Sequence, residues 1–275
     1  MSASTDSESP DLGEGLLSRF GGEETDAAED GRARMSFLDH LDELRRRVIY
    51  SVYAVLGGCL IAFFYLKRIE DAVMGPLQAL IPNGAKFIYT QPMEYFIFKM
   101  KAGLLVGVML ASPVVLLQVW YFIAPGLYSK EKKLAVPFVT ASTGLFLTGA
   151  WFAHQFAFRW TWRFLASMTN QYVQFMPKLE ETFSLYLMVV LGFGVVFQMP
   201  VVVFVLARFG LVTARFLITK GKYAILLIFI LAAVLSPGPD VVSQLLFAAP
   251  MLVLYAISIV VAWLFAKKKK KAGSI

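Results

Sequence analysis

Residues 183–207 read FSLYLMVVLGFGVVFQMPVVVFVLA, a run of 25 residues without Asp, Glu, Lys or Arg. An α-helix of this length extends about 38 Å at roughly 1.5 Å per residue, whereas the hydrocarbon core of a bilayer is about 30 Å thick. The run therefore predicts a helix that crosses a membrane.

Five further apolar stretches flank this run, and the charges of the chain crowd at their edges. None of the five contains Asp, Glu, Lys or Arg; they are residues 48–66, 102–124, 134–157, 223–236 and 245–266. Overall, 58% of the residues are hydrophobic and 16% are charged, against about 25% charged in a typical soluble domain. This composition excludes a water-soluble domain. We predict an all-α, polytopic membrane protein whose six transmembrane helices lie within residues 35–266.

The fifth and sixth segments are predicted to be short helices. Residues 223–236 number only 14, which corresponds to about 21 Å of helix. The turn Ser236-Pro-Gly-Pro-Asp240 breaks helices, and Pro250 interrupts the sixth segment. We expect so short a hairpin either to be shielded by neighbouring helices or to thin the bilayer locally.

The distribution of charge predicts the orientation. Residues 1–34 carry nine acidic and three basic side chains and few large apolar ones, which predicts a disordered acidic tail. Cytoplasmic loops are rich in Lys and Arg, so both termini are predicted to be cytoplasmic, with residues 267–275 as a basic tail. The basic residues of that side outside residues 1–34 are Arg45, Arg46, Arg47, Lys130, Lys132, Lys133, Arg208, Arg215, Lys220, Lys222 and Lys267 to Lys271. The net charge of +7 is the sum of a negative charge on residues 1–34 and a larger positive charge on the rest of the chain. It does not indicate nucleic-acid binding.

The sequence offers no catalytic or metal-binding pattern. Cys59 is the single cysteine, and His40 and His154 fall on opposite predicted sides, so no enzymatic activity, metal or cofactor is expected. The deepest polar side chains, Ser112, Gln118 and Gln198, are neutral. Carriers usually hold ionisable groups within the membrane, which weakens the alternative of a secondary transporter for a small solute.

Two features predict how the helices pack. Gly103, Gly107 and Ala111 recur every four residues and form a face on which another helix backbone can approach closely. Gln198 precedes Pro200, which cannot donate a hydrogen bond to the carbonyl one turn earlier. The Gln198 amide is expected either to bond to that freed backbone or to meet a partner helix or substrate.

The predicted cytoplasmic edge carries two acids among basic residues. Ser36 to Asp39 form a capping-box start, and Phe37, Leu41, Leu44 and Val48 form one apolar stripe of an interfacial helix. On another face of this helix, Glu43 either pairs with Arg47 four residues on or receives a cationic ligand.

Glu131 lies among Lys130, Lys132 and Lys133. It either balances the charge of its loop or joins Glu43 as a second carboxylate. Two such carboxylates can each bind a guanidinium group through two parallel hydrogen bonds. A purely structural scaffold, the third class of function, has no reason to present two acids on a basic face.

Four separated motifs resemble those of one family, in order, over about residues 36–265. They are FLDHLDELRRR at 37–47, FIAPGLY at 122–128 followed by Glu131, FGVVFQMP at 193–200, and SPGPDVVSQ at 236–244. They are similar to the motifs of TatC, the multispanning subunit of the twin-arginine protein translocase. The resemblance implies a receptor in the bacterial cytoplasmic membrane that binds twin-arginine signal peptides of folded cargo proteins.

The resemblance also implies roles for individual residues. The signal-peptide surface would comprise Glu43, Glu131, Arg45, Phe122, Pro125 and Leu127. Phe197, Gln198 and Pro200 would contact the single-span partners TatA and TatB, and Pro76 and Asp240 would shape the external loops or contact partners. Self-association and transport driven by the proton-motive force are implied as well.

The chain departs from the family pattern at two positions. Many members carry Glu where this chain has Gln198, so direct protonation at this position is excluded and a hydrogen-bonding role is favoured. The sixth-helix motif often reads Leu-Tyr-Glu, whereas Leu254-Tyr255 is followed here by Ala256.

Overall fold

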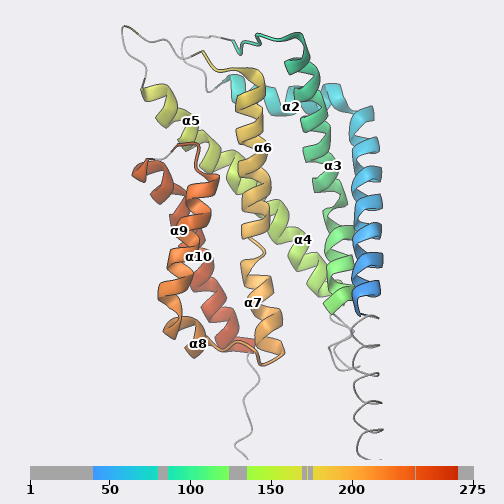
Figure 1. The fold of residues 1–275 in the computed structure, drawn as a ribbon, viewed down its shortest axis with the longest axis vertical. Helices are drawn as coiled ribbons and strands as arrows, with labels where there is room; N and C mark the ends of the chain where they lie inside the picture. Colours follow the sequence, from blue (N-terminus) through green and yellow to red (C-terminus); the bar gives the residue numbers. More distant parts are fainter. Residues whose placement is uncertain are drawn as a thin grey trace, which may run out of the picture. The chain divides into compact units, whose positions relative to one another are not determined.

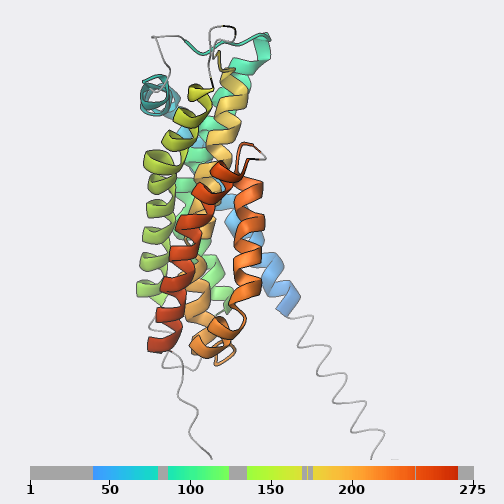
Figure 2. The ribbon, with the colours of Figure 1, turned by 90° about the vertical axis from the view of Figure 1, so that its left-hand side faces the viewer.

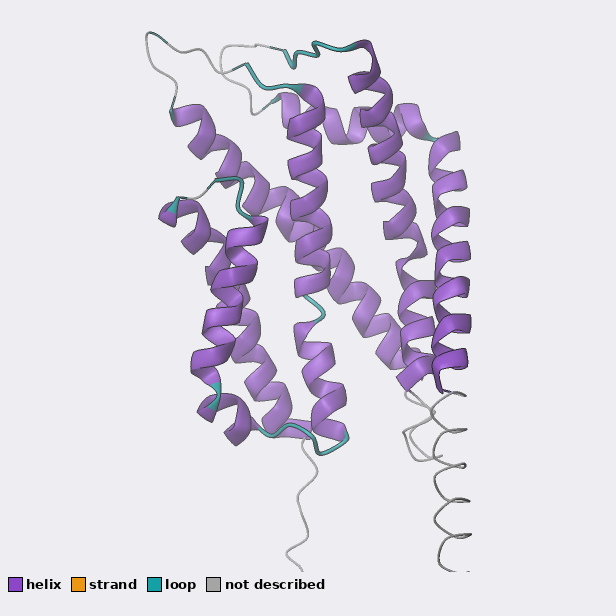
Figure 3. Ribbon diagram, in the orientation of Figure 1, coloured by secondary structure: helices purple, strands orange, loops and turns teal. Residues whose placement is uncertain are grey.

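The structure is a computed structural model, and it describes residues 40–79, 86–123, 135–168, 172, 176–238 and 240–265. Within these ranges the regular structure is helical (Figures 1 and 3). The chain divides into two units, residues 1–49 and 50–275, and each is described by itself. The predicted tails at 1–34 and 267–275 lie outside the described residues.

Six apolar helical segments confirm the predicted number of spans. Five are long enough to cross a membrane, at His40–Phe64, Pro92–Ile123, Val136–Ser167, Leu179–Arg208 and Val241–Phe265, and the sixth, Gly221–Leu235, is shorter. The labelled helices are α2 (Leu66–Gln78), α3 (Pro92–Ile123), α4 (Ala135–Phe152), the π-helix η4 (Ala153–Ala157), α5 (Phe158–Ser167), α6 (Leu179–Val196), α7 (Met199–Arg208), α8 (Ala214–Thr219), α9 (Gly221–Leu235) and α10 (Val241–Phe265).

The prediction of a short fifth helix is confirmed, and that of a short sixth helix is wrong. Helix α9 has 15 residues, but α10 has 25 and starts directly after Asp240. Pro250 lies inside α10 without ending it. A proline removes one helical hydrogen bond, and its ring crowds the carbonyl one turn earlier. Buried residues on both sides of Pro250, among them Ala248 and Met251, nevertheless hold α10 in one helix.

Two short helices mark the ends of the bundle formed by residues 50–265. Helix α2 follows the turn at Tyr65 and runs crosswise to α3 and α6, near the residues where both begin (Figures 1 and 2). Helix α8 lies at the opposite end, where α4 begins and where α7 and α10 finish (Figures 1 and 2). We call these the α2 end and the α8 end.

Small residues allow the first span to approach α3 closely, as the Gly103, Gly107 and Ala111 face predicts. A Cβ atom added at Gly107 would lie 2.6 Å from the Cys59 Sγ and 2.7 Å from the Cys59 backbone nitrogen. A Cβ at Gly58 would lie 2.4 Å from the Gly107 carbonyl oxygen. Because these contacts involve backbone, side chains cannot move aside to relieve them. The glycines therefore fix the distance between the two helices.

Aromatic side chains fill the centre of the bundle. Phe98 of α3 and Phe183 of α6 pack edge to face with ring centroids 4.9 Å apart, and Phe193 of α6 lies 5.6 Å from Phe247 of α10. All four are at most 1% exposed, which makes them the anchors of the packing between α3, α6 and α10.

Ionic contacts join the helices at the α2 end. The Lys101 ammonium of α3 donates to Glu180 and to Ser184 of α6. The hydroxyl of Tyr95 in α3 donates to Glu70 of α2, and Lys99 lies 3.8 Å from the same carboxylate. A single bridge between Ile88 and Lys178 ties the segments that lead into α3 and α6. The contacts of Glu70 hold α2 against α3, whereas the others join α3 to α6 and the segments that precede them.

Candidate functional site

Glu43 lies in the first turns of helix His40–Phe64 and pairs with a cation of its own helix. Its Oε1 accepts a hydrogen bond from Arg47 Nη2 at 3.2 Å, and the two side chains are 28% and 27% exposed. This i,i+4 pair is the first of the two alternatives that the sequence leaves open. Surface pairs of this kind stabilise a helix by only about 0.3–0.5 kcal/mol.

The side chains around Glu43 are largely exposed. Arg45 is exposed, and Leu41, Leu44 and Val48 are 44%, 40% and 51% exposed. The spacing of these three leucine and valine positions puts them on one face of the helix, as predicted for an interfacial segment. The predicted capping box at 36–39 lies outside the described residues.

The second half of the predicted signal-peptide surface is described only at Phe122. This residue lies half-buried in the last turn of α3, which ends at Ile123. Glu131, Pro125 and Leu127 lie outside the described residues. The pairing of Glu43 with Glu131 therefore stays a prediction.

Gln198 lies at a break in the fourth span, and its amide bonds to another helix. Helix α6 ends at Val196 and α7 starts at Met199, with Pro200 in the first turn of α7. The Gln198 Nε2 donates to the Ser142 carbonyl oxygen of α4 at 3.0 Å. Within the chain, the acceptor is thus the neighbouring helix α4 rather than the backbone freed by Pro200. The contact of Gln198 with a partner helix or substrate stays a prediction.

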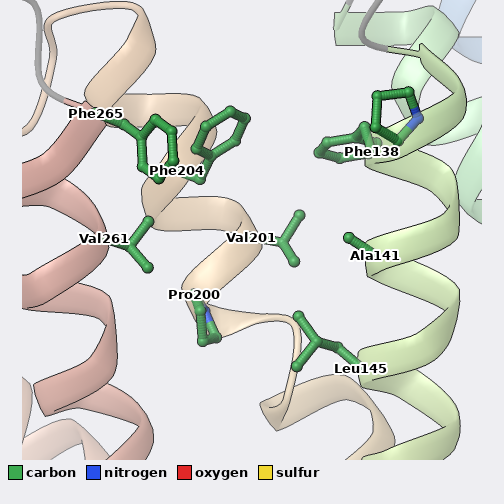
Figure 4. Close-up of a pocket in the computed structure, with 9 residues that line it drawn as sticks. Phe138, Ala141, Leu145, Pro200, Val201, Phe204, Val261 and Phe265 are labelled. Atoms are coloured by element: carbon green, nitrogen blue, oxygen red, sulfur yellow. The ribbon is translucent and has the colours of Figure 1, made fainter.

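The two residues beside Gln198 contact different surroundings. The Phe197 ring packs against Phe152 of α4 and Phe193 of α6, at 5.7 and 6.4 Å between centroids. Pro200 is buried and lines an apolar cavity between α4, α7 and α10 (Figure 4). Each thus has contacts within the chain.

A second cavity, of about 620 Å³, lies between α6, α7 and α9. Gln198 is the polar side chain of a lining that is otherwise apolar, with Val195 and Val202 on one side and Leu231 and Val234 on α9. Val195, Val202 and Val234 are more than half exposed. The cavity is therefore open along the side of the bundle, where a single apolar helix can lie against it.

The two residues predicted in external loops lie near helix ends. Pro76 is half-buried inside α2, close to its last turn. Asp240 caps α10, because its Oδ2 accepts the Ser243 backbone N–H at 2.7 Å. This hydrogen bond from the backbone amide lowers the pKa of the Asp240 carboxyl below its ordinary value. Asp240 therefore has a structural use at the start of α10.

Two polar contacts between helices are not anticipated from the sequence. The Gln244 Nε2 of α10 donates to the Phe229 carbonyl oxygen of α9 at 3.0 Å, which closes the α9–α10 hairpin. The π-helix η4 carries His154, whose Nδ1 lies 3.0 Å from the Tyr186 hydroxyl of α6. A polar residue in an apolar run signals such contacts, but the run does not identify the partner.

Comparisons with known proteins agree with the motif resemblance. The family model described as Sec-independent protein translocase protein (TatC) matches residues 39–250. Within the part of the chain that the structure describes, no three His, Cys, Asp or Glu side chains gather into a group that could hold a metal ion.

Named relatives match most of the chain. The Sec-independent protein translocase protein TatC of Desulforapulum autotrophicum is 40% identical over 233 residues, which cover 85% of this chain and 86% of the relative. The protein of the same name from Carboxydothermus hydrogenoformans is 38% identical over 239 residues, covering 87% and 97%. The crystal structure described as Twin Arginine Translocase Receptor TatC matches with a TM-score of 0.72 and 36% identity, covering 81% of this chain and 97% of that structure.

Proposed function

The chain belongs to the TatC family of Sec-independent protein translocase proteins, and we propose that it binds twin-arginine signal peptides through Glu43 and Glu131. Because it belongs to this family, the chain is a membrane-embedded component of protein translocation rather than an enzyme. The proposed ligand is cationic, which fits two carboxylates on a basic surface.

The observation that carries the proposal is the family match over residues 39–250, which takes in both acids and their motifs. The local structure of Glu43 supports it. The carboxylate is more than a quarter exposed and is held by a pair within its own helix. It is therefore accessible to a ligand that offers a better hydrogen-bond geometry.

The magnitudes favour exchange of Arg47 for a ligand arginine. The i,i+4 pair contributes about 0.3–0.5 kcal/mol. Arg47 forms one hydrogen bond to Glu43, whereas a ligand guanidinium can form two parallel bonds to one carboxylate, which binds more strongly.

The other residues of the proposed surface contact the signal-peptide residues on either side of the arginine pair. Phe122, Pro125 and Leu127 supply apolar contact beside the acids, and Arg45 adds a second hydrogen-bonding group on the first helix. The apolar segment of the signal peptide then enters the membrane along the helices. Segments of this kind partition into the hydrocarbon core because their side chains are apolar.

The orientation and the partners are part of the same proposal. Residues 1–34 and 267–275 form cytoplasmic tails around the transmembrane domain at 35–266, in a bacterial cytoplasmic membrane. Single-span TatA and TatB subunits contact the fourth span at Phe197, Gln198 and Pro200, and Pro76 and Asp240 lie on the external side. Copies of this chain associate in the complex, and the proton-motive force drives transport.

Site-specific crosslinking of a twin-arginine signal peptide tests the two acids. The variant Glu43→Gln with Glu131→Gln is expected to lose at least about tenfold in crosslinking, since each substitution removes a charged acceptor. Asp42→Asn, which removes a neighbouring negative charge, serves as the matched control and is expected to crosslink as the wild type does. Unchanged crosslinking in the double variant, with normal membrane insertion, would defeat the assignment. Solute flux through proteoliposomes that contain this chain alone would favour a transporter.

A further inference from the structure

Two arginines on one face of α5 have no anionic partner among the described residues. Arg159 and Arg163 are four residues apart, which brings their Cβ atoms within about 5–6 Å. Arg163 is exposed and Arg159 is half-buried, and the buried Arg159 Nε has no hydrogen-bond acceptor in the described part of the chain. Arg159 interacts electrostatically with His154, which cannot carry a negative charge. Because like charges at this spacing destabilise a helix, the pair does not serve the stability of α5.

The acids of the α2 end do not neutralise this pair. Four of them have other partners: Glu70 binds Tyr95, Glu94 binds Thr90, Glu180 binds Lys101 and Glu181 binds Lys178. Asp71 is exposed on α2 and forms no ion pair with a described residue. The segments 80–85 and 169–175, which follow α2 and α5 in the chain, contain no Asp or Glu. The arginine pair therefore presents an excess of positive charge.

The pair lies where the third span leaves the hydrocarbon core. This span runs toward the α2 end and has 32 residues, Val136–Ser167 (Figures 1 and 2), which is about 48 Å of helix against a core of about 30 Å. No Asp, Glu, Lys or Arg occurs in residues 134–158. Arg159 follows Val136 by 23 residues, or about 35 Å. At this depth a guanidinium group meets lipid headgroups rather than acyl chains.

A row of exposed aromatic rings leads along the span to the arginines. The ring centroids of Trp151 and Phe156 are 5.8 Å apart, and those of Phe156 and Trp160 are 6.2 Å apart. Trp151 and Phe156 are five residues apart and come together because the wider turn of the π-helix η4 puts them on one side. Trp160 is 46% exposed. Tryptophan concentrates at the level of the headgroups in membrane proteins, so Trp160 marks that level beside Arg159.

We propose that Arg159 and Arg163 bind the phosphate of one anionic phospholipid from the leaflet at the α2 end, with Trp160 beside its headgroup. A phosphate offers several acceptor oxygens, and a guanidinium binds such a group through two parallel hydrogen bonds. The lipid thus neutralises the two like charges and supplies the acceptors that the chain does not.

The charges select this ligand over an apolar helix. A helix packed on this face through apolar side chains would bury the two guanidinium groups without acceptors, which is costly. A headgroup of net negative charge is favoured over phosphatidylcholine, because the choline cation is repelled by the same arginines.

Crosslinking at a single position tests the headgroup preference. The full chain, with a photoreactive side chain in place of Trp160, is inserted into vesicles of equal parts phosphatidylglycerol and phosphatidylcholine with the same acyl chains. Mass spectrometry of the crosslinked peptide is expected to show at least about fivefold more phosphatidylglycerol than phosphatidylcholine. Equal amounts of the two adducts would overturn the proposal.

A matched pair of variants separates the site from the general charge of the chain. Arg159→Gln with Arg163→Gln is expected to give equal amounts of the two lipid adducts at an unchanged total yield. Lys67→Gln with Arg68→Gln removes the same charge from exposed positions of α2 and is expected to keep the preference. If both double variants lose the preference equally, the overall charge of the α2 end attracts the lipid, and the arginine site is excluded.

The same crosslink in native membranes identifies the occupant. The expected adduct has the mass of an anionic phospholipid. An adduct with a single-span protein, or with a second copy of this chain, would show that a protein covers the arginines and would overturn the proposal.

Discussion

The contact between residues 50–64 and α3 differs in kind from the first turns of helix His40–Phe64. In the former, Gly58 and Gly107 bring two backbones together so closely that an added methyl group has no space. In the latter, exposed side chains surround Glu43, which pairs within its own helix. We therefore expect stability to depend on the glycine contact and ligand binding to depend on Glu43. Substitutions should then affect stability in the first region and binding in the second.

The largest loss of stability is expected for Gly107→Ala, because the new Cβ would lie 2.6 to 2.8 Å from three atoms of Cys59. Forced overpacking of this kind costs about 1–3 kcal/mol. Gly144→Ala is the matched control, since nothing lies within 4 Å of its Cβ and alanine favours helix over glycine by about 0.5–1 kcal/mol. Thermal unfolding in detergent measures both. Equal unfolding temperatures for the two variants would contradict the close approach.

A smaller loss is expected for Gln198→Leu, which removes the hydrogen bond to the Ser142 carbonyl oxygen. The expected cost is about 0.5–1.5 kcal/mol, because that oxygen lies inside α4 and keeps its bond within the helix. Gln198→Glu should be less stable than the wild type at neutral pH and recover toward low pH, since only the protonated carboxyl can donate. Unfolding temperatures between pH 4 and pH 8 give the comparison, and a variant without pH dependence would argue against this donor role.

Asp240→Ala is expected to have a modest, pH-dependent effect. The Ser243 backbone N–H lowers the pKa of the Asp240 carboxyl from its ordinary value of 3.8, so the ionised form stabilises the folded chain above that pH. The contribution disappears as the pH falls through the lowered pKa of the folded state. The unfolding temperatures of wild type and variant should therefore differ at pH 7 and converge below pH 4. Asp71→Ala, at an exposed position of α2, is the control and should show no such convergence.

The smallest effect on stability is expected for Glu43→Gln. Loss of the pair with Arg47 should change the free energy of unfolding by no more than about 0.5 kcal/mol, although signal-peptide binding is lost. Thermal unfolding and peptide binding measured on the same preparation check both parts. A drop in stability as large as that of Gly107→Ala would mean that Glu43 serves the fold rather than the ligand.

Most of the fold can be predicted from the sequence because apolar length and charge placement determine where helices cross a membrane. The glycine face of α3 is predictable for the same reason, since Gly103 and Gly107 recur with the helical period. The length of α10 is not predictable, because Pro250 indicates a break in the sequence whereas packing on both sides of Pro250 preserves the helix. The crosswise path of α2 is set by contacts of Glu70 with Tyr95 and Lys99, and no local pattern identifies such partners.

The candidate site is predictable in part. The i,i+4 spacing predicts the pair of Glu43 with Arg47, which the structure shows. The binding of a ligand by Glu43 and Glu131, which the motifs predict, stays a prediction. The acceptor of Gln198 is not predictable, because it depends on how the break before Pro200 turns the side chain relative to α4. The apolar cavity between α4, α7 and α10 is likewise formed by helices that are distant in sequence, and only their packing brings Ala141, Val201 and Val261 together.

The most direct measurement of the central claim is a double-mutant cycle between Glu43 and each arginine of the signal peptide. Binding affinities are measured for wild type and Glu43→Gln, with peptides in which one arginine or the other is replaced by glutamine. We predict a coupling of at least about 1 kcal/mol between Glu43 and one of the two arginines, as expected for groups in direct contact. Additive effects with both peptides, and hence no coupling, would contradict direct recognition by Glu43.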